Sequence, residues 1–356
     1  MKPTERAFAG LWGSVIGDAL GVPVEFQSRA RLDADPVTDM RSFGSHNQPP
    51  GTWSDDTSMM LGIIDSLLER DVFDTEDIAK RFIRWYRDGE YTPHGRVFDI
   101  GGTTAQALTR YEQHRVPAEQ AGMTGEHSNG NGALMRTLPL ALAYSHLPAA
   151  EMAERVERVA SITHGHAVSR MSCVHYCLVA RRVMSGQPLE GSLHAANLEF
   201  AELYRGRPEE LYLPRFHRLL DASILTQPRS EIQSSGYTIH TLEAAIWCTH
   251  RAATFEEAVL AAVNLGEDTD TTGMVTGGLA AMIHGIATPE VRNWARVIVR
   301  TKDLQGKFKS FISKMLETQM RTSLYEKFSR LAKGAQAASP HSVAASAQPQ
   351  NPGGLV

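Results

Sequence analysis

Cysteine is scarce in this chain, with three residues among 356. So few cysteines argue against a disulfide framework and fit a protein that works in a reducing compartment. Cys173 and Cys177 flank His175, a grouping that superficially resembles a metal site. The two cysteines are one helical turn apart beside Met171 and Val174, so we expect small buried core residues here and not zinc ligands.

A surplus of positive charge is also lacking. The chain has 36 Lys and Arg against 40 Asp and Glu, a formal net charge of −4, and no basic block. Nucleic-acid binding needs such a block to neutralise phosphates. We therefore expect no nucleic-acid partner.

No apolar run reaches the ~20 residues that span a bilayer. The apolar segment 7–16 follows Lys2 and Arg6 and superficially resembles a signal peptide, but Asp18 interrupts it and no clean cleavage site follows. We expect a buried N-terminal helix in a cytoplasmic protein without a membrane partner.

Apolar residues recur at helical spacing along most of the sequence, and convincing alternating strands are absent. The capping box that begins at Thr254 and the proline at Pro289 mark two helix starts. We predict an all-α fold with one compact domain over 1–334, and a disordered tail at 335–356, where Ala, Ser, Pro, Gln and Gly dominate. Residues 186–236 give the weakest pattern. The predicted helices span 5–18, 57–69, 76–87, 102–114, 132–145, 149–160, 166–184, 238–250, 255–264, 271–286, 290–301 and 304–331.

Two acidic and hydroxyl-rich clusters stand far apart in the sequence, each where a helix is predicted to begin: Ser54-Asp55-Asp56-Thr57 and Asp268-Thr269-Asp270-Thr271-Thr272. Such residues commonly cap helices, which explains either cluster alone. Capping needs one carboxylate, however, and neighbouring carboxylates repel. A shared cation would remove that cost, and oxygen ligands suit Mg²⁺, Mn²⁺ or Ca²⁺. The pair therefore predicts a metal site with charge enough for two divalent ions.

Three glycine-rich segments offer places where backbone N–H groups can approach an anion such as a diphosphate: Gly17-Asp18-Ala19-Leu20-Gly21, Gly101-Gly102-Thr103-Thr104 and Ser128-Asn129-Gly130-Asn131-Gly132. We expect turns between helices at these positions. Glycines that end helices or let them pack closely are the alternative explanation of any one segment.

Four further side chains have two interpretations each. His164 can bond a ligand or cap a helix end, and Tyr237 can stack on a sugar or base or pack into the core. Glu25 and Asp99 can serve as the general base or electrostatic stabiliser of a glycosidic cleavage, or can be ordinary exposed carboxylates.

In their order along the chain, these motifs resemble the ADP-ribosylglycohydrolase family, from about residue 6 to residue 286. The matching positions are Gly17 to Gly21 with Glu25, Ser54 to Thr57, Asp99 to Gly101, Gly130 to Ala133 with Arg136, Thr163-His164, Ser235 to Tyr237, and Asn264 to Thr271.

The resemblance implies an all-α fold with a binuclear Mg²⁺ or Mn²⁺ centre that cuts the bond between ADP-ribose and a modified side chain. It implies metal ligands at Ser54, Asp55, Asp56, Asp268, Asp270 and Thr271, and acid or base residues at Glu25 and Asp99. The residues expected around ADP-ribose are Gly101, Ser128, Asn129, Gly130, Asn131, Gly132, Met135, His164 and Tyr237. Two cations can orient the ribose hydroxyls while a carboxylate manages the proton.

Two positions depart from the family pattern. Gly102 stands where nitrogenase-associated members carry Asn, and Glu267 stands where many members carry Gly and would add a carboxylate beside the metals. Because Glu25 and Asp99 resemble the arginine-directed branch, we expect an ADP-ribosylated protein modified on arginine as the substrate. The alternatives are a small compound such as O-acetyl-ADP-ribose, a binding role without catalysis, or an immunity protein that blocks an ADP-ribosyltransferase toxin.

Overall fold

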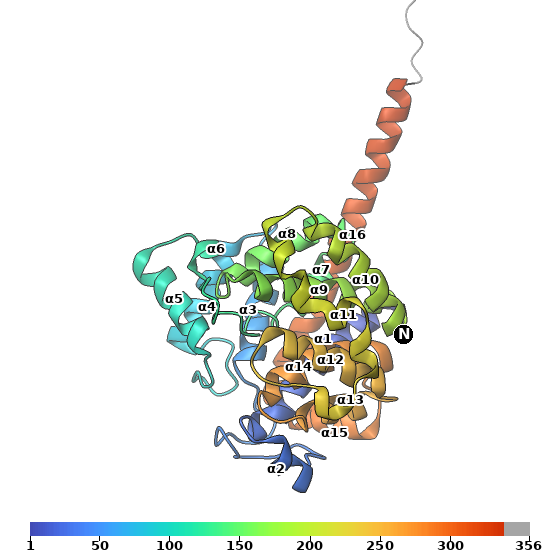
Figure 1. Ribbon diagram of the computed structural model, residues 1–356. Coiled ribbons are helices and arrows are strands. Elements are labelled where there is room, and N and C mark those ends of the chain that lie inside the picture. The colour runs from blue at the N-terminus through green and yellow to red at the C-terminus, as the bar shows by residue number, and fades with distance from the viewer. Residues whose placement is uncertain (338–356) are drawn as a thin grey trace, which may run out of the picture. The chain divides into compact units, whose positions relative to one another are not determined.

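The structure, a computed structural model, describes residues 1–337 and is built from helices (Figure 1). Within that range it has no β-strand, only isolated bridges such as the one between Gly130 and Tyr237. The predicted all-α fold is confirmed. The tail predicted at 335–356 lies outside the described residues except for its first three, which complete the last helix.

Most predicted helices are present, with ends that differ by a few residues. The α-helices are α1 Pro3–Gly21, α2 Arg29–Ala34, α3 Asp55–Glu69, α4 Thr75–Asp88, α5 Gly102–His114, α6 Ala118–Ala121, α7 Leu138–Ala143, α8 Ala149–Ser161, α9 Ala167–Met184, α10 Leu189–Tyr204, α11 His217–Leu220, α12 Thr238–Arg251, α13 Phe255–Val263, α14 Thr269–His284, α15 Pro289–Val297 and α16 Thr301–Ala337. Thr254 caps α13, because its Oγ1 accepts a hydrogen bond from Glu257 N, while Glu257 Oε2 accepts from Ala253 N and not from Thr254 N as a full capping box requires. Pro289 begins α15.

Two local predictions are wrong. The segment 17–21 is not a turn but the last part of α1. The single helix predicted over 132–145 is only the short α7, since the backbone N–H groups of Leu134 and Met135 both donate to Asn131 O in a separate turn. Pro139 suits the first turn of a new helix, which is where α7 begins.

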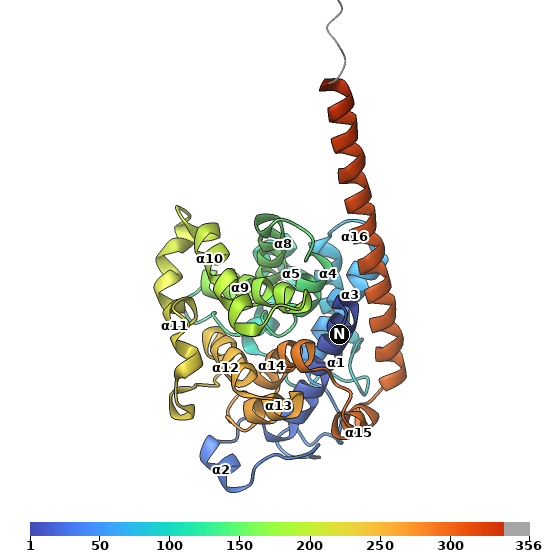
Figure 2. The ribbon, with the colours of Figure 1, turned by 90° about the vertical axis from the view of Figure 1, so that its right-hand side faces the viewer.

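α14 packs against α1, α12 and α13 (Figure 2). The contact between α1 and α14 is made by glycines: a Cβ on Gly13 would lie 2.3 Å from Gly277 O, and one on Gly17 would lie 2.1 Å from Gly273 O. The absence of side chains lets the two backbones touch. This approach brings the start of α14 to the end of α1, where a Cβ on Gly21 would lie 2.3 Å from Asp270 Cα.

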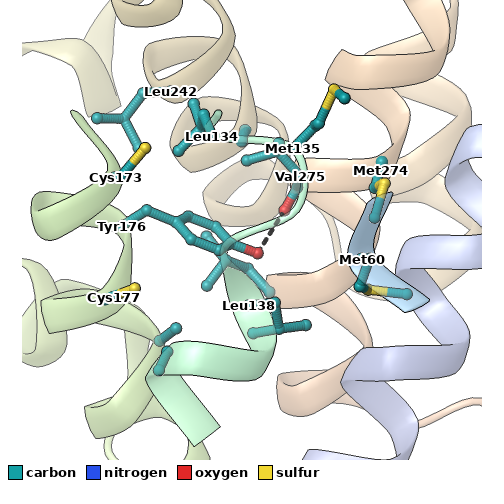
Figure 3. Packing of buried hydrophobic residues seen from close by; sticks show 14 of the residues in the cluster. Met60, Leu134, Met135, Leu138, Cys173, Tyr176, Cys177, Leu242, Met274 and Val275 are labelled. Carbon is teal, nitrogen blue, oxygen red and sulfur yellow. Dashed lines mark hydrogen bonds between the residues drawn. The ribbon is translucent and has the colours of Figure 1, made fainter. Parts of the chain in front are cut away.

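The core between α9 and α14 is sulfur-rich and apolar (Figure 3). Tyr176 of α9 donates its hydroxyl to Val275 O of α14, at 3.2 Å. Cys173 and Cys177 are free and buried, as predicted, and His175 pairs with Asn197 Oδ1 at 2.8 Å.

Residues Met1–Met315 form a compact unit, and residues 316–337, the last part of α16, belong to a second one. Among the described residues, one helical segment, α1 with its short continuation (Pro3–Val24), is long and apolar enough to cross a membrane by length and composition, but 94% of its apolar 18-residue window is buried inside the protein. α1 is thus a core helix, as expected.

Candidate active site

The two acidic clusters meet at the starts of α3 and α14. Thr271 Oγ1 donates to Asp56 Oδ1 at 3.3 Å, which links the clusters directly. Carboxylate oxygens of Glu25, Asp268 and Asp270 lie within 4.8 Å of one another. Residues distant in sequence therefore share one site, because the glycine contact holds the end of α1 against the start of α14.

Asp18, within α1, holds the start of α3 in place. Its carboxylate accepts hydrogen bonds from the backbone N–H of Ser54 at 2.9 Å, from Thr57 N at 3.1 Å and from Thr57 Oγ1 at 2.6 Å. Ser54 Oγ in turn accepts from Asp56 N and caps α3. Burial raises the pKa of Asp18 to about 6. Since all three partners are donors, Asp18 acts as an anchor beneath the clusters.

Three buried carboxylate oxygens have no hydrogen-bond partner: Asp56 Oδ2, Asp268 Oδ1 and Asp270 Oδ2. Burial, followed by the repulsion of other carboxylates, raises the pKa of Asp55, Asp56 and Asp270 well above the usual range. Unpaired buried carboxylates are costly, and cations offset that cost. The oxygen-only donor set fits hard divalent ions. Glu25, Asp268 and Asp270 form one group that could hold a metal ion, Asp55 and Asp56 line the same cleft, and Ser54 is buried at the start of α3.

A cleft of about 210 Å³ opens above these carboxylates. It is lined by Glu25, Asp55, Asp56, Asp99, Gly101, Gly102, Thr103, Thr104, Gly130, Asn131, Gly132, Met135, His164, Gly236, Asp268 and Thr271. Ser54, Ser128, Asn129, Asp270 and Tyr237 were predicted for the site but do not line the cleft. Asp270 is buried next to it, and Asn129 and Tyr237 lie at its edge, where Thr238 N donates to Asn129 O.

The glycine turn at 130–132 forms one wall of the cleft. Asn131 Nδ2 donates to Asp268 Oδ2 at 2.9 Å and to Thr241 Oγ1 at 2.8 Å, and Asn131 N donates to Gly236 O. A Cβ on Gly132 would lie 2.8 Å from His164 Cε1, so only glycine allows the imidazole this close. Burial, with a smaller effect from Arg136, lowers the pKa of His164 to about 3. His164 is thus a neutral side chain of the wall.

A family model described as ADP-ribosylglycohydrolase matches residues 1–324. The chain belongs to the ADP-ribosylglycohydrolase family. It is 33% identical over 282 residues to the ADP-ribosylarginine hydrolase Tri1 of Serratia proteamaculans (strain 568), covering 79% of this chain and 72% of that one. It is 28% identical to the ADP-ribosyl-[dinitrogen reductase] glycohydrolase of Rhodospirillum rubrum, covering 79% and 86%. A solved structure titled "ADP-ribosylglycohydrolase-related protein complex" aligns with a TM-score of 0.73 at 31% identity, over 88% of this chain and 99% of that chain.

The chain is accordingly an ADP-ribosylglycohydrolase enzyme, and its two expected acid or base residues, Glu25 and Asp99, both line the cleft. His46 Nε2 is hydrogen-bonded to Glu25 Oε2 and lies 3.8 Å from Asp99 Oδ2. Burial, followed by the negative charges of Asp99 and Asp268, raises the pKa of Glu25 to about 11. Glu25, His46 and Asp99 thus form one cluster, with side-chain ligand atoms that all lie within 4.8 Å of one another.

The sequence did not identify Asp18 or His46 as site residues. Asp18 carries a signal in retrospect, because a charged residue inside an apolar helix stripe needs a buried partner. His46 carries none, since its position depends on a turn at 43–48 whose Gly44 would clash with Pro23 O if it had a Cβ.

Of the two residues that depart from the ADP-ribosylglycohydrolase pattern, Gly102 lines the cleft and Glu267 does not. Gly102 is the first residue of α5 and lines the cleft. The carboxylate that Glu267 was expected to add beside the metals is absent there, because Glu267 is exposed and does not line the cleft. Its φ of 62° is left-handed, the conformation that glycine adopts without strain.

Proposed function

We propose that this ADP-ribosylglycohydrolase removes ADP-ribose from arginine side chains of modified proteins in the cytoplasm, with two Mg²⁺ or Mn²⁺ ions. The observation that carries the proposal is the set of unpaired buried oxygens on Asp56, Asp268 and Asp270 beneath a glycine-lined cleft. Cations held by these carboxylates would bind the hydroxyls of a sugar, and the backbone N–H groups of the glycine turn at 130–132 can approach a diphosphate.

The charge of the cleft supports a cationic leaving group. Among the described residues, its lining contains Glu25, Asp99 and three other carboxylates but no Lys or Arg. A guanidinium pairs well with carboxylates, whereas a serine hydroxyl brings no charge to offset them. Relatives from Serratia proteamaculans and Pseudomonas putida (strain GB-1), at 33% and 31% identity, carry the name ADP-ribosylarginine hydrolase.

Each group of residues has a distinct proposed role. Ser54, Asp55, Asp56, Asp268, Asp270 and Thr271 hold the cations, which supply positive charge that polarises the ribose hydroxyls. The turn at 130–132, flanked by Gly101, Ser128, Asn129, Met135, His164 and Tyr237, holds the ADP-ribose. Glu25 or Asp99 handles the proton that the departing guanidine must gain.

The test is the release of ADP-ribose from an arginine-ADP-ribosylated protein, with Mg²⁺ or Mn²⁺ and then with EDTA. Asp268→Asn should abolish release, because an amide cannot replace a charged ligand. Glu267→Gln is the matched control: it neutralises the adjacent carboxylate, which is exposed and outside the cleft, and should release ADP-ribose as the wild type does.

The outcomes separate the candidate substrates. Metal-dependent release that is lost only in Asp268→Asn supports the proposal. Release from serine-linked protein or from O-acetyl-ADP-ribose, without release from arginine, would contradict the arginine assignment and retain the hydrolase.

A further inference from the structure

Phe26, the residue directly after Glu25, is an exposed aromatic residue with a strained backbone conformation. Its side chain is 71% exposed, and its φ of 61° is left-handed, where a bulky side chain is strained. Phe26 N donates to Glu267 O at 2.6 Å, which fixes the strained residue beside the start of α14. Strain and apolar exposure at one residue next to an active site favour a functional role over a packing role.

Two aromatic rings, those of Phe26 and Phe98, lie near the ring of His46. The His46 ring lies 5.7 Å from the Phe26 ring and 5.4 Å from the Phe98 ring, centroid to centroid. Phe98 directly precedes Asp99, so Glu25 and Asp99 each have an aromatic neighbour in sequence. Phe26, His46 and Phe98, here called the aromatic rim, therefore lie beside Glu25 and Asp99.

The aromatic rim and the two carboxylates together suit a planar cation. A planar cation gains from an aromatic face and from carboxylates at once, because the ring quadrupole and the negative charges attract the same group. A guanidinium is planar and carries several N–H donors, so it satisfies both. A neutral hydroxyl leaving group gains neither.

We propose that the aromatic rim is the subsite for the leaving side chain, with the exposed face of Phe26 binding the guanidinium of the substrate arginine. This inference rests on the proposed function, because it names the residues beside Glu25 and Asp99 that distinguish arginine from neutral linkages. His46 and Phe98 are positioning residues that hold Phe26 and the two carboxylates in place.

The first experiment measures KM and kcat on ADP-ribosyl-arginine for Phe26→Leu and Phe26→Tyr. Leu keeps an apolar side chain but has no aromatic face, so KM should rise about 3- to 30-fold while kcat stays within about twofold. Tyr keeps the face and should retain the wild-type KM. Phe43→Leu is the matched control, because Phe43 is also exposed (55%) and left-handed (φ 67°). Phe26 differs from it in following Glu25 directly and in packing its ring near His46.

The second experiment does not depend on turnover. Agmatine, a small guanidinium compound, is titrated into the Mg²⁺-loaded protein saturated with ADP-ribose. Wild type, Phe26→Tyr and Phe43→Leu should bind it alike, and Phe26→Leu about 3- to 30-fold more weakly, with the ADP-ribose affinity unchanged as evidence of intact folding.

The two sets of results keep the inference and the proposed function apart. Equal agmatine binding by wild type and Phe26→Leu overturns the inference, even if arginine-linked ADP-ribose is released. Loss of agmatine binding in Phe26→Leu supports it, even if the natural substrate has another linkage. An equal loss in Phe43→Leu overturns it, since the effect would not be specific to the aromatic rim.

Discussion

Glu25 is the residue on which the proposed chemistry depends most directly. It is only 5% exposed, and one carboxylate oxygen is bonded to His46. Asp99 is the other carboxylate at this position and is half-buried. A single substitution can distinguish them, because an amide keeps the size of Glu25 but cannot give or take the proton of a carboxyl group.

We expect Glu25→Gln to reduce kcat by about 10²- to 10⁴-fold, the usual contribution of a general acid or base. The affinity for ADP-ribose, measured by calorimetry with Mg²⁺, should stay within about threefold, since the glycine wall and the two acidic clusters remain. Unchanged turnover would assign the proton transfer to Asp99.

Glu267 offers a test of backbone strain at the residue scale. Its left-handed conformation costs a non-glycine residue about 1 kcal/mol, and its exposed side chain contributes little. Glu267→Gly should therefore raise the free energy of unfolding by about 0.5–1 kcal/mol in urea titrations. Glu267→Ala keeps the strain, so an equal gain there would refute this explanation.

The site residues differ in how far the sequence could reveal them. Asp55, Asp56, Asp268 and Asp270 stand in compact acidic motifs, and the structure brings these motifs together. His46 reaches Glu25 only through the close approach of Gly44 to Pro23, a contact that no local pattern encodes.

At the scale of the helices, the pairing of α1 with α14 builds the site. Gly13, Gly17 and Gly21 face Gly277, Gly273 and Asp270 across this contact. Two helices with larger side chains would stand farther apart, and Asp270 would then move away from Glu25. The alternative explanation of the 17–21 segment, that its glycines let helices pack closely, is the one that the structure supports.

Gly17→Ala should lower the free energy of unfolding by about 1–3 kcal/mol, because its Cβ would overlap Gly273 O and force the helices apart. Activity should fall in the molecules that remain folded. The matched substitution is Gly191→Ala on α10, where a Cβ meets no atom within 4 Å. It should be neutral or stabilising by up to about 1 kcal/mol, by urea unfolding.

The sequence predicts the helices whose buried face is apolar throughout, but not a helix such as α10 whose buried face also contains polar residues. α10 buries Ser192 and Asn197 among its apolar residues and exposes Leu198, so its apolar spacing is broken. The 3₁₀ segment Pro208–Phe216 that follows contains an internal proline and has no 3.6-residue period. These features explain why residues 186–236 gave the weakest pattern.

For the whole molecule, the buried His175 contributes to the loss of stability in acid. Burial lowers the pKa of His175 to about 4, below the ordinary value of 6.5. The unfolded chain therefore binds a proton at pH 5 that the folded chain excludes, so stability falls as the pH drops below about 6.5. The contribution of His175 to this loss between pH 7 and pH 5 is about 2 kcal/mol.

The measurement is urea unfolding of wild type and His175→Gln at pH 7 and pH 5. Gln can still donate to Asn197 but does not titrate. The loss of stability from pH 7 to pH 5 should be about 2 kcal/mol smaller in the variant. An identical loss in both proteins would show that His175 keeps its ordinary pKa in the folded state.

The packing of α1 against α14 affects how the chain folds during its synthesis. α1 leaves the ribosome early, yet the glycine face that covers it belongs to residues 269–284. At ordinary rates of translation, the apolar surface of α1 waits tens of seconds for its partner. During that time the exposed apolar surface makes the incomplete chain prone to aggregation.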